Sequence, residues 1–221
     1  PECEPWSKIQ QLKHEREVTG FYMSGHPLDD YKNEIKHFCD VSIGDLLENL
    51  KSYKNRNITL AGMVTSATSR FTKGGQPFGT FQLEDFEDTI QMALFSEDYL
   101  KFRHFLVEGN YLLIKARIQN RYNLENHLEI KITSISLLAE AMQNNTREIT
   151  VLLDSAKVDK ESIAKLKSLI VEHKGNIPIR IKLYDRDENK TIELKARTAK
   201  VEPSGFLKAL ELEGGINYKL N

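Results

Sequence analysis

The spacing of apolar residues changes along the chain and divides it into four segments. A period near 3.6 residues indicates an amphipathic helix, whereas strict alternation of apolar and polar residues indicates a half-buried strand. The helical period dominates at the beginning, alternation dominates in the middle, and both occur near the end. The segments are a helical lead-in at 1–56, a β-domain at 57–138, a polar linker at 139–147 and an α+β domain at 148–221.

The lead-in contains one clear amphipathic stripe. Its members occupy the i, i+3, i+4 and i+7 positions of one helix face: Ile43, Leu46, Leu47 and Leu50. Ser42 precedes the stripe and is a suitable N-cap, because its hydroxyl can accept a hydrogen bond from a first-turn amide. We therefore predict a helix that begins after Ser42 and buries this stripe.

The middle segment predicts an OB-fold, a five-stranded Greek-key β barrel. Its expected elements are strands at 58–71, 78–84 and 89–95, a short helix at 97–106, and strands at 111–121 and 127–138. Three strands, a helix and two further strands is the order of this fold. Alternation places these side chains inside: Phe81, Leu83, Ile90, Met92, Leu94, Leu112, Ile114, Ala116 and Ile118. The opposite face of the second and third strands carries Phe78, Thr80, Gln82, Gln91 and Ala93.

The last segment predicts a smaller ferredoxin-like domain. Its expected elements are a strand at 148–153, a helix at 160–173, a hairpin of strands at 177–184 and 190–201, a helix at 206–213 and a strand at 216–220. This β-α-β-β-α-β order is typical of the ferredoxin-like unit. Gly175 is expected to end the first of these helices.

The final helix of this domain has more apolar positions than one core face of a short helix needs. They are Phe206, Leu207, Leu210 and Leu212. Burial of all four within the domain is one interpretation. The other is a surface that docks a protein partner, which the mixed charge of this segment favours over DNA.

Composition narrows the functional classes. Of the 221 residues 40% are hydrophobic and 29% are charged, as in a soluble globular protein, and no apolar run approaches the ~20 residues that span a bilayer. No signal peptide is visible, and the chain starts at Pro1, so we expect a piece of a longer cytoplasmic protein without a membrane partner. Cys3 and Cys39 are far apart and lack the spacing of metal ligands. We expect no metal and no cofactor.

The net charge of −1 limits nucleic-acid binding to a local surface. A protein that wraps DNA alone carries a clear basic excess, because neutralised phosphates supply most of the affinity. OB-folds bind single strands with the face of strands two and three and with two loops. The candidates on these positions combine cations, aromatic rings and polar groups: Arg70, Phe71, Lys73, Phe78, Thr80, Arg121, Tyr122, Asn123 and His127. The alternative is that Phe71 and Phe78 plug the barrel mouth and the cations form a solvated rim.

Two other groups could carry chemistry but have simpler explanations. Asp85, Glu87 and Asp88 cluster in one tight turn, whereas two-metal catalysis needs carboxylates from facing strands, so we interpret them as hairpin residues. His26 precedes Pro27, and we expect its ring to bond the local backbone. Phosphate-binding loops and nucleophile motifs are absent from the sequence, which predicts no catalytic residues.

Three blocks of sequence resemble the bacterial replicative DNA polymerase III alpha subunit family. They are EREVTGFYMSGHPLDDY at 15–31, TKGGQPFGTFQLEDFEDTIQMALFSEDY at 72–99, and the segment from Glu148 onward. The resemblance implies the non-catalytic C-terminal part of a DNA-directed DNA polymerase, a nucleotidyltransferase whose catalytic aspartates lie upstream. It implies that the OB-fold binds single-stranded template DNA in DNA replication and that the last domain docks the tau subunit of the clamp loader.

The same resemblance implies further partners and a location. They are the rest of the polymerase chain and its holoenzyme, a sliding clamp bound through a motif upstream of this chain, and the replisome at the nucleoid. Two alternatives remain from the sequence. One is the OB-fold anticodon-binding domain of a tRNA synthetase-like protein, which leaves the first and third blocks unexplained. The other is a scaffold whose OB-fold binds protein.

Overall fold

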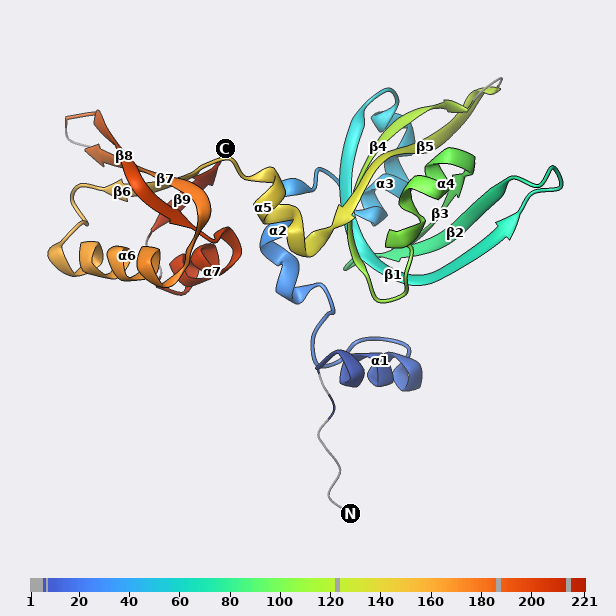
Figure 1. Cartoon of the computed structure of the whole chain (residues 1–221), viewed down its shortest axis with the longest axis horizontal. Coiled ribbons are helices and arrows are strands. Elements are labelled where there is room, and N and C mark those ends of the chain that lie inside the picture. Colours follow the sequence, from blue (N-terminus) through green and yellow to red (C-terminus); the bar gives the residue numbers. More distant parts are fainter. Residues whose placement is uncertain (1–5, 7, 122–123, 186–187, 214–215) are drawn as a thin grey trace, which may run out of the picture. The chain divides into compact units, whose positions relative to one another are not determined.

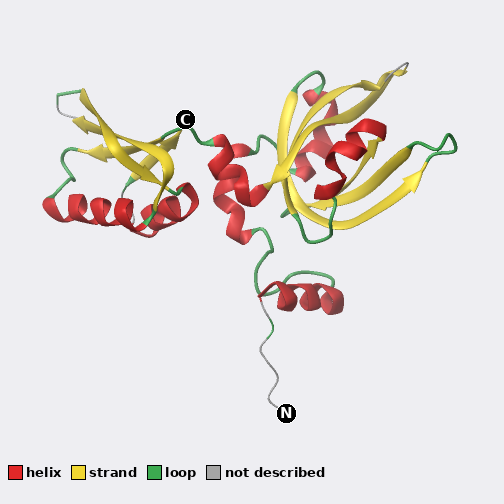
Figure 2. Cartoon of the chain, viewed as in Figure 1, coloured by secondary structure: helices red, strands yellow, loops and turns green. Residues whose placement is uncertain are grey.

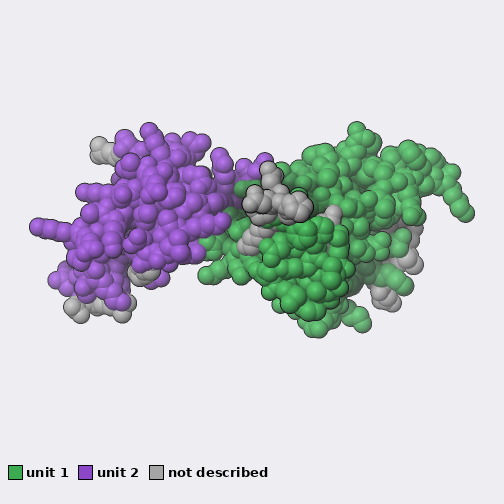
Figure 3. Space-filling view, turned by 90° about the horizontal axis from the view of Figure 1, so that it is seen from below, with its two compact units in different colours: residues 1–139 green, residues 140–221 purple. Residues whose placement is uncertain are grey.

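The computed structural model describes residues 6, 8–121, 124–185, 188–213 and 216–221 (Figure 1). Its helices, with η for 3-10 turns, are α1 Lys8–Thr19, η1 Asp29–Tyr31, α2 Lys32–Phe38, α3 Ile43–Asn49, η2 Leu50–Tyr53, α4 Ser96–Phe102, η3 Arg103–Phe105, η4 Leu138–Glu140, α5 Ala141–Asn145, α6 Lys160–Glu172 and α7 Pro203–Glu213. Its strands are β1 Asn57–Phe71, β2 Pro77–Glu84, β3 Thr89–Phe95, β4 Tyr111–Arg121, β5 Leu124–Leu137, β6 Ile149–Asp154, β7 Lys174–Asp185, β8 Lys190–Val201 and β9 Asn217–Leu220. The chain divides into unit 1, residues 1–139, and unit 2, residues 140–221 (Figure 3).

The sheet of unit 1 is antiparallel and is organised around the long strand β1. Its order is β3-β2-β1-β4-β5. The first half of β1 pairs with β4 and the second half pairs with β2, with Met63 in both ladders. The register shifts between Val64 and Ser66, and such a bulge bends a strand. The bend allows one strand to serve both halves of the sheet.

The closed barrel predicted from the sequence is wrong, although the OB-fold element order is observed. Within the described ranges no ladder joins the outer strands β3 and β5. Helix α4 contacts β2 and β3, and η3 contacts β5, so this helical connection lies where strand pairing would close the sheet. An ion pair between Asp98 of α4 and Lys131 of β5 joins the two sides.

The core of unit 1 follows the alternation in the sequence. Every side chain predicted to point inward on β2, β3 and β4 is buried. Helix α3 adds Ile43 and Leu46, which are fully buried, but Leu47 is 48% exposed, so the helical stripe is narrower than predicted. Ser42 caps this helix as predicted, because its hydroxyl accepts a hydrogen bond from the Asp45 amide at 3.2 Å.

Unit 2 contains a four-stranded mixed sheet of order β8-β7-β6-β9. The predicted β-α-β-β-α-β element order is observed, but a ferredoxin-like strand order is not. In that fold a further strand lies between the two parallel strands of the βαβ unit. Here β6 and β7 pair directly and in parallel. The β7–β8 hairpin holds β8 on the outer edge of β7, and β9 takes the other edge of β6.

Helices α6 and α7 lie on one face of this sheet (Figure 2). On α7 the side chains of Phe206, Leu207 and Leu210 are fully buried, whereas Leu212 is 89% exposed. Three of the four apolar positions on the last helix are therefore core, and one faces solvent.

Gly175 has a different role from the helix end that was predicted. Helix α6 ends at Glu172, and Gly175 lies inside β7. A Cβ at this position would stand 2.2 Å from the Glu202 nitrogen and 2.4 Å from the Val201 carbonyl carbon. The glycine is required because the end of β8 crosses the start of β7 at this point.

Candidate nucleic-acid interface

The outward face of β1, β2 and β3 carries three rows of side chains that cross all three strands. Inter-strand registers place the members of each row directly opposite one another. The rows are Ser66–Gln82–Gln91, Thr68–Thr80–Ala93 and Arg70–Phe78–Phe95. The opposite side of β2 and β3 is packed into the core, so this face is the one available to a ligand.

The third row combines one cation with two aromatic rings. Phe78 and Phe95 are stacked, with ring centroids 5.6 Å apart and an angle of 15° between the rings. Phe95 is 55% exposed, and Arg70 lies opposite Phe78 on β1. Phe71 is 74% exposed, which excludes the alternative that it plugs a barrel mouth. Phe78 itself is half-buried. A partly exposed aromatic pair beside a cation is suited to base stacking and phosphate contact.

A groove of about 270 Å³ runs along these rows. Its lining includes Thr68, Arg70, Phe78, Thr80 and Gln91. The hydroxyl oxygens of Thr68 and Thr80 are 2.8 Å apart and share a hydrogen bond. The structure therefore brings Arg70, Phe78 and Thr80, three of the predicted site residues, into one groove.

The other predicted residues lie at or near the tips of two hairpins. Lys73 is exposed in the turn between β1 and β2, which closes with a hydrogen bond from the Thr72 amide to the Gln76 carbonyl. Arg121 and His127 are exposed on the β4–β5 hairpin, a separate element from the groove. Tyr122 and Asn123 lie outside the described residues. Both hairpins project toward the same side of unit 1 (Figure 1).

Phe95 and the two glutamines were not among the predicted site residues. Gln82, Gln91 and Ala93 had been assigned to the correct face, and Phe95 is the next position of the same alternation. Extending the alternation by two residues would have found it. The pairing of Phe95 with Phe78 depends on the β2–β3 register, which alternation alone does not supply.

The acidic turn between β2 and β3 is structural, as the sequence indicated. Asp85 is buried, and its Oδ1 accepts hydrogen bonds from the amides of Glu87 and Asp88, both at 2.9 Å. Its Oδ2 accepts from the amide of Ile43, the first residue of α3, at 2.6 Å. Among the described residues no group of three or more His, Cys, Asp and Glu side chains is arranged to hold a metal ion.

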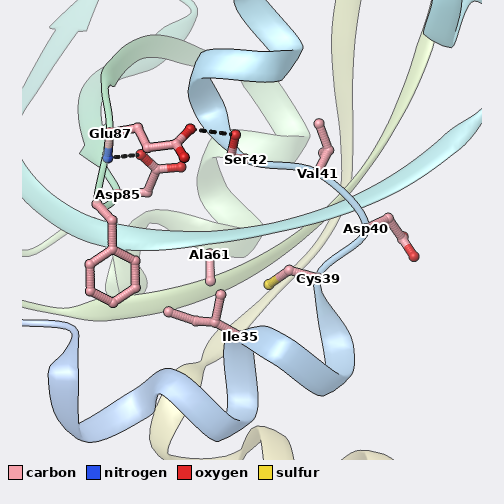
Figure 4. Close-up of a pocket in the computed structure, with 9 residues that line it drawn as sticks. Ile35, Cys39, Asp40, Val41, Ser42, Ala61, Asp85 and Glu87 are labelled. Carbon is pink, nitrogen blue, oxygen red and sulfur yellow. Dashed lines mark hydrogen bonds between the residues drawn. The ribbon is translucent and has the colours of Figure 1, made fainter.

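A second cavity of about 280 Å³ lies beside this turn (Figure 4). Ile35, Cys39 and Ala61 line its apolar part. On its other side the Glu87 carboxylate accepts a hydrogen bond from the Ser42 hydroxyl, and the Glu87 amide donates one to Asp85. Burial raises the pKa of the Cys39 thiol to about 12. A thiol with this pKa stays protonated at neutral pH and is a poor nucleophile. This cavity is therefore a weaker candidate than the groove.

The lead-in packs against the same acidic turn. The ring centroids of His26 and Phe86 are 4.6 Å apart. The Nδ1 atom of His26 accepts a hydrogen bond from the Leu28 amide at 3.1 Å. Burial lowers the pKa of His26. The predicted local hydrogen bond is confirmed, and the ring packs against Phe86.

The carboxylate of Glu15 holds the segment before His26. Hydrogen bonds from the Ser24 hydroxyl and amide and from the Met23 amide lower its pKa to about 2. Arg16 of the same helix donates to the Tyr22 hydroxyl at 3.0 Å and pairs with Glu84 at the end of β2. These contacts explain how the 15–31 block is ordered without assigning it a catalytic role.

In the part of the chain that the structure describes, no helix combines the length and the apolar character that crossing a membrane requires. The fold defines a class: an OB-fold domain followed by a second unit of mixed α and β structure. Residues 58–138 match the family model described as the OB-fold nucleic acid binding domain. Residues 149–221 match the model of the DNA polymerase III alpha subunit, C-terminal domain.

Relatives that match most of this chain are also DNA polymerase III alpha subunits. DNA polymerase III subunit alpha of Saccharopolyspora erythraea is 27% identical over 80% of this chain and 15% of its own length. The subunit of Borreliella burgdorferi is 29% identical over 86% of this chain and 16% of its own length. That of Escherichia coli O157:H7 is 26% identical over 93% of this chain and 17% of its own length. The chain is related to the C-terminal region of the bacterial DNA polymerase III alpha subunits, and it spans about a sixth of the length of these relatives.

A solved structure of asparaginyl-tRNA synthetase from Pyrococcus horikoshii covers 39% of this chain and 20% of its own length, at 12% identity and a TM-score of 0.28. This likeness is too low to support an argument. The tRNA synthetase alternative leaves residues 149–221 unexplained, whereas the polymerase III match accounts for them.

Proposed function

We propose that this chain is the non-catalytic C-terminal part of a replicative DNA polymerase III alpha subunit in the bacterial cytoplasm. Its OB-fold binds single-stranded template DNA, and its second unit docks the clamp-loader tau subunit. The polymerase reaction belongs to the part of the protein upstream of this chain.

The observation that carries the DNA-binding proposal is the row of Arg70, Phe78 and Phe95 on the outward face of the OB-fold. Phe78 and Phe71 would stack bases, and each stacked base contributes about 1–3 kcal/mol. Arg70, Lys73 and Arg121 would hold phosphates. Tyr122 keeps the stacking role predicted from the sequence. Because the chain has a net charge of −1, these local cations carry the electrostatic part of the affinity.

The test is a fluorescence-anisotropy titration of labelled oligo-dT at two salt concentrations, with duplex DNA for comparison. We expect salt-sensitive binding that favours the single strand. The Arg70→Ala/Lys73→Ala variant should bind several-fold more weakly and lower the salt slope by about 1.4, roughly 0.7 for each lost phosphate contact.

A matched control removes two exposed lysines of β8, with Lys195→Ala and Lys200→Ala, and should leave affinity and slope unchanged. An unchanged slope in the Arg70/Lys73 variant would exclude these residues as phosphate contacts. Absence of any binding at low salt would remove the DNA-binding role and favour the scaffold alternative.

Exposed apolar residues on unit 2 support the docking proposal. Ile192 and Leu194 of β8 are 56% and 54% exposed. They lie opposite Leu183 and Ile181, on the side of the sheet that faces the helices, but α6 and α7 leave them uncovered. Leu212 adds an exposed apolar side chain on α7.

The Ile192→Ser/Leu194→Ser variant should bind the tau subunit about tenfold more weakly than the wild type in a surface-plasmon-resonance titration, because apolar anchors dominate such interfaces. The control is Val171→Ser, which removes an apolar side chain that is 76% exposed on α6. Equal binding by both variants and the wild type would show that the β8 surface is not the docking site. Failure of the wild-type chain to bind tau would refute the docking role.

A further inference from the structure

We propose that the groove across β1, β2 and β3 holds a single unstacked nucleobase and reads its edge through the side-chain amides of Gln82 and Gln91. This inference rests on the proposed binding of single-stranded DNA. It adds a hydrogen-bonded contact to the edge of the base, whereas the proposed site contacts base faces by stacking and phosphates through cations.

The two glutamines stand side by side at one end of the groove. They are directly opposite across the β2–β3 ladder, and both line the groove with Ser66 opposite Gln82 on β1. Directly opposite residues have Cβ atoms about 4.5–5.5 Å apart, so both amides can reach one ligand. Both side chains are exposed.

The chemistry of these groups matches a base edge. A glutamine amide presents two donor hydrogens next to an acceptor oxygen. A nucleobase edge also presents donors next to acceptors, and glutamine pairs with the N6 and N7 atoms of adenine in this way. Thr68 and Thr80 add hydroxyls in the next row; since one donates to the other, the second hydroxyl hydrogen remains for a ligand.

The distribution of charge indicates that the glutamine end of the groove contacts a base rather than a phosphate. Charged residues make up 29% of the chain, yet the Ser66–Gln82–Gln91 and Thr68–Thr80–Ala93 rows contain none. Phosphates are bound mainly through cations, whereas neutral amides and hydroxyls are suited to base edges. Arg70, in the third row, is placed to contact the phosphate of the same nucleotide while Phe78 offers its ring to the base.

The size of the groove suits a ligand of one base. Its volume is about 270 Å³, slightly below the ~300 Å³ at which sites for drug-sized ligands begin. A run of stacked bases would need a longer site. A base in this groove must therefore leave the stack, which a single strand permits at lower cost than a duplex.

The test compares labelled oligo-dA with an abasic deoxyribose-phosphate oligomer of the same length and charge, by anisotropy at two low salt concentrations. The wild-type chain should bind oligo-dA more tightly. The Gln82→Leu/Gln91→Leu variant keeps the side-chain size but removes the amides. It should lose about tenfold in affinity for oligo-dA, the effect of a well-formed base contact. Its affinity for the abasic oligomer and its salt slope should not change.

Gln143→Leu, an exposed glutamine on α5 of unit 2, is the matched control and should behave as the wild type. An unfolding midpoint equal to that of the wild type shows that the double variant is folded, and Gln91→Leu alone gives a milder second variant. If the double variant bound oligo-dA as tightly as the wild type, base reading would be overturned while the stacking and phosphate contacts of the DNA-binding proposal would stand. Equal binding of both oligomers by the wild type would overturn base reading and also the stacking by Phe71 and Phe78, and would leave only the phosphate contacts. Failure to bind any oligomer would overturn both.

Discussion

Replacing Asp85 with alanine is expected to lower the free energy of unfolding of unit 1 by about 3–5 kcal/mol, because a buried, hydrogen-bonded carboxylate is lost. The carboxylate accepts hydrogen bonds from three backbone amides, those of Ile43, Glu87 and Asp88. The alanine variant would leave the Ile43 amide, at the start of α3, without its acceptor. Hydrogen exchange of core amides in β1 and β4, followed by NMR, measures the change within unit 1 alone.

Asp88→Ala is the matched control for this experiment. Asp88 belongs to the same turn, but it is exposed and its carboxylate accepts a bond from the adjacent Thr89 amide. Removing an exposed group of this kind should cost less than about 1 kcal/mol. If the two variants lost equal stability, the burial of Asp85 and its bond to α3 would not be what stabilises the turn.

The Asp85 result would also separate two explanations of the acidic cluster. Carboxylates that bind a metal repel one another in its absence, so their removal stabilises the metal-free protein. Carboxylates that accept backbone hydrogen bonds stabilise it instead. The hydrogen bonds that Asp85 accepts from the amides of Ile43, Glu87 and Asp88 support the second explanation.

Local sequence patterns predicted side-chain faces better than strand pairing. Phe81 and Ile114 are buried as alternation requires, since the two-residue period follows from the geometry of one strand. Closure of a barrel depends on which strand edges meet. The bulge after Val64 and the helix that follows Phe95 determine those edges, and neither has a two-residue period.

The strand order of unit 2 escaped prediction for the same reason. The sequence contains the elements β-α-β-β-α-β, and several sheets can be built from them. Direct pairing of β6 with β7 rests on contacts such as Val151 with Ile181, which are distant in the sequence. Apolar residues of this kind in both strands are compatible with the observed strand order and with the ferredoxin-like one.

The sequence placed some residues of the candidate site on the correct face, but it did not predict the groove. Arg70, Phe78 and Thr80 were expected on OB-fold positions, and the structure assembles them through two ladders. Phe95 and the Gln82–Gln91 pair join them only once the register is known. Residue types predict the kind of chemistry, while the register determines which groups can act on one ligand.

Gly175→Ala is expected to destabilise unit 2 by about 3 kcal/mol, the upper part of the usual range for overpacking. The new Cβ would overlap the backbone of Val201 and Glu202 at distances that real Cβ atoms do not adopt. The Glu202 carboxylate accepts hydrogen bonds from the amides of Ser204 and Gly205 at the start of α7, so a shift of Glu202 also loosens that helix. Hydrogen exchange of amides in β6 and β7 measures the loss.

Asn176→Ala, at the exposed neighbouring position, should change the stability of unit 2 by less than about 0.5 kcal/mol.

The same two variants also test where the DNA site lies. Because the proposed groove is built entirely from β1, β2 and β3, Gly175→Ala should keep the wild-type affinity for oligo-dT while losing affinity for tau as unit 2 opens. A parallel loss of DNA binding would mean that unit 2 contributes to the DNA site, and the groove alone would no longer account for it.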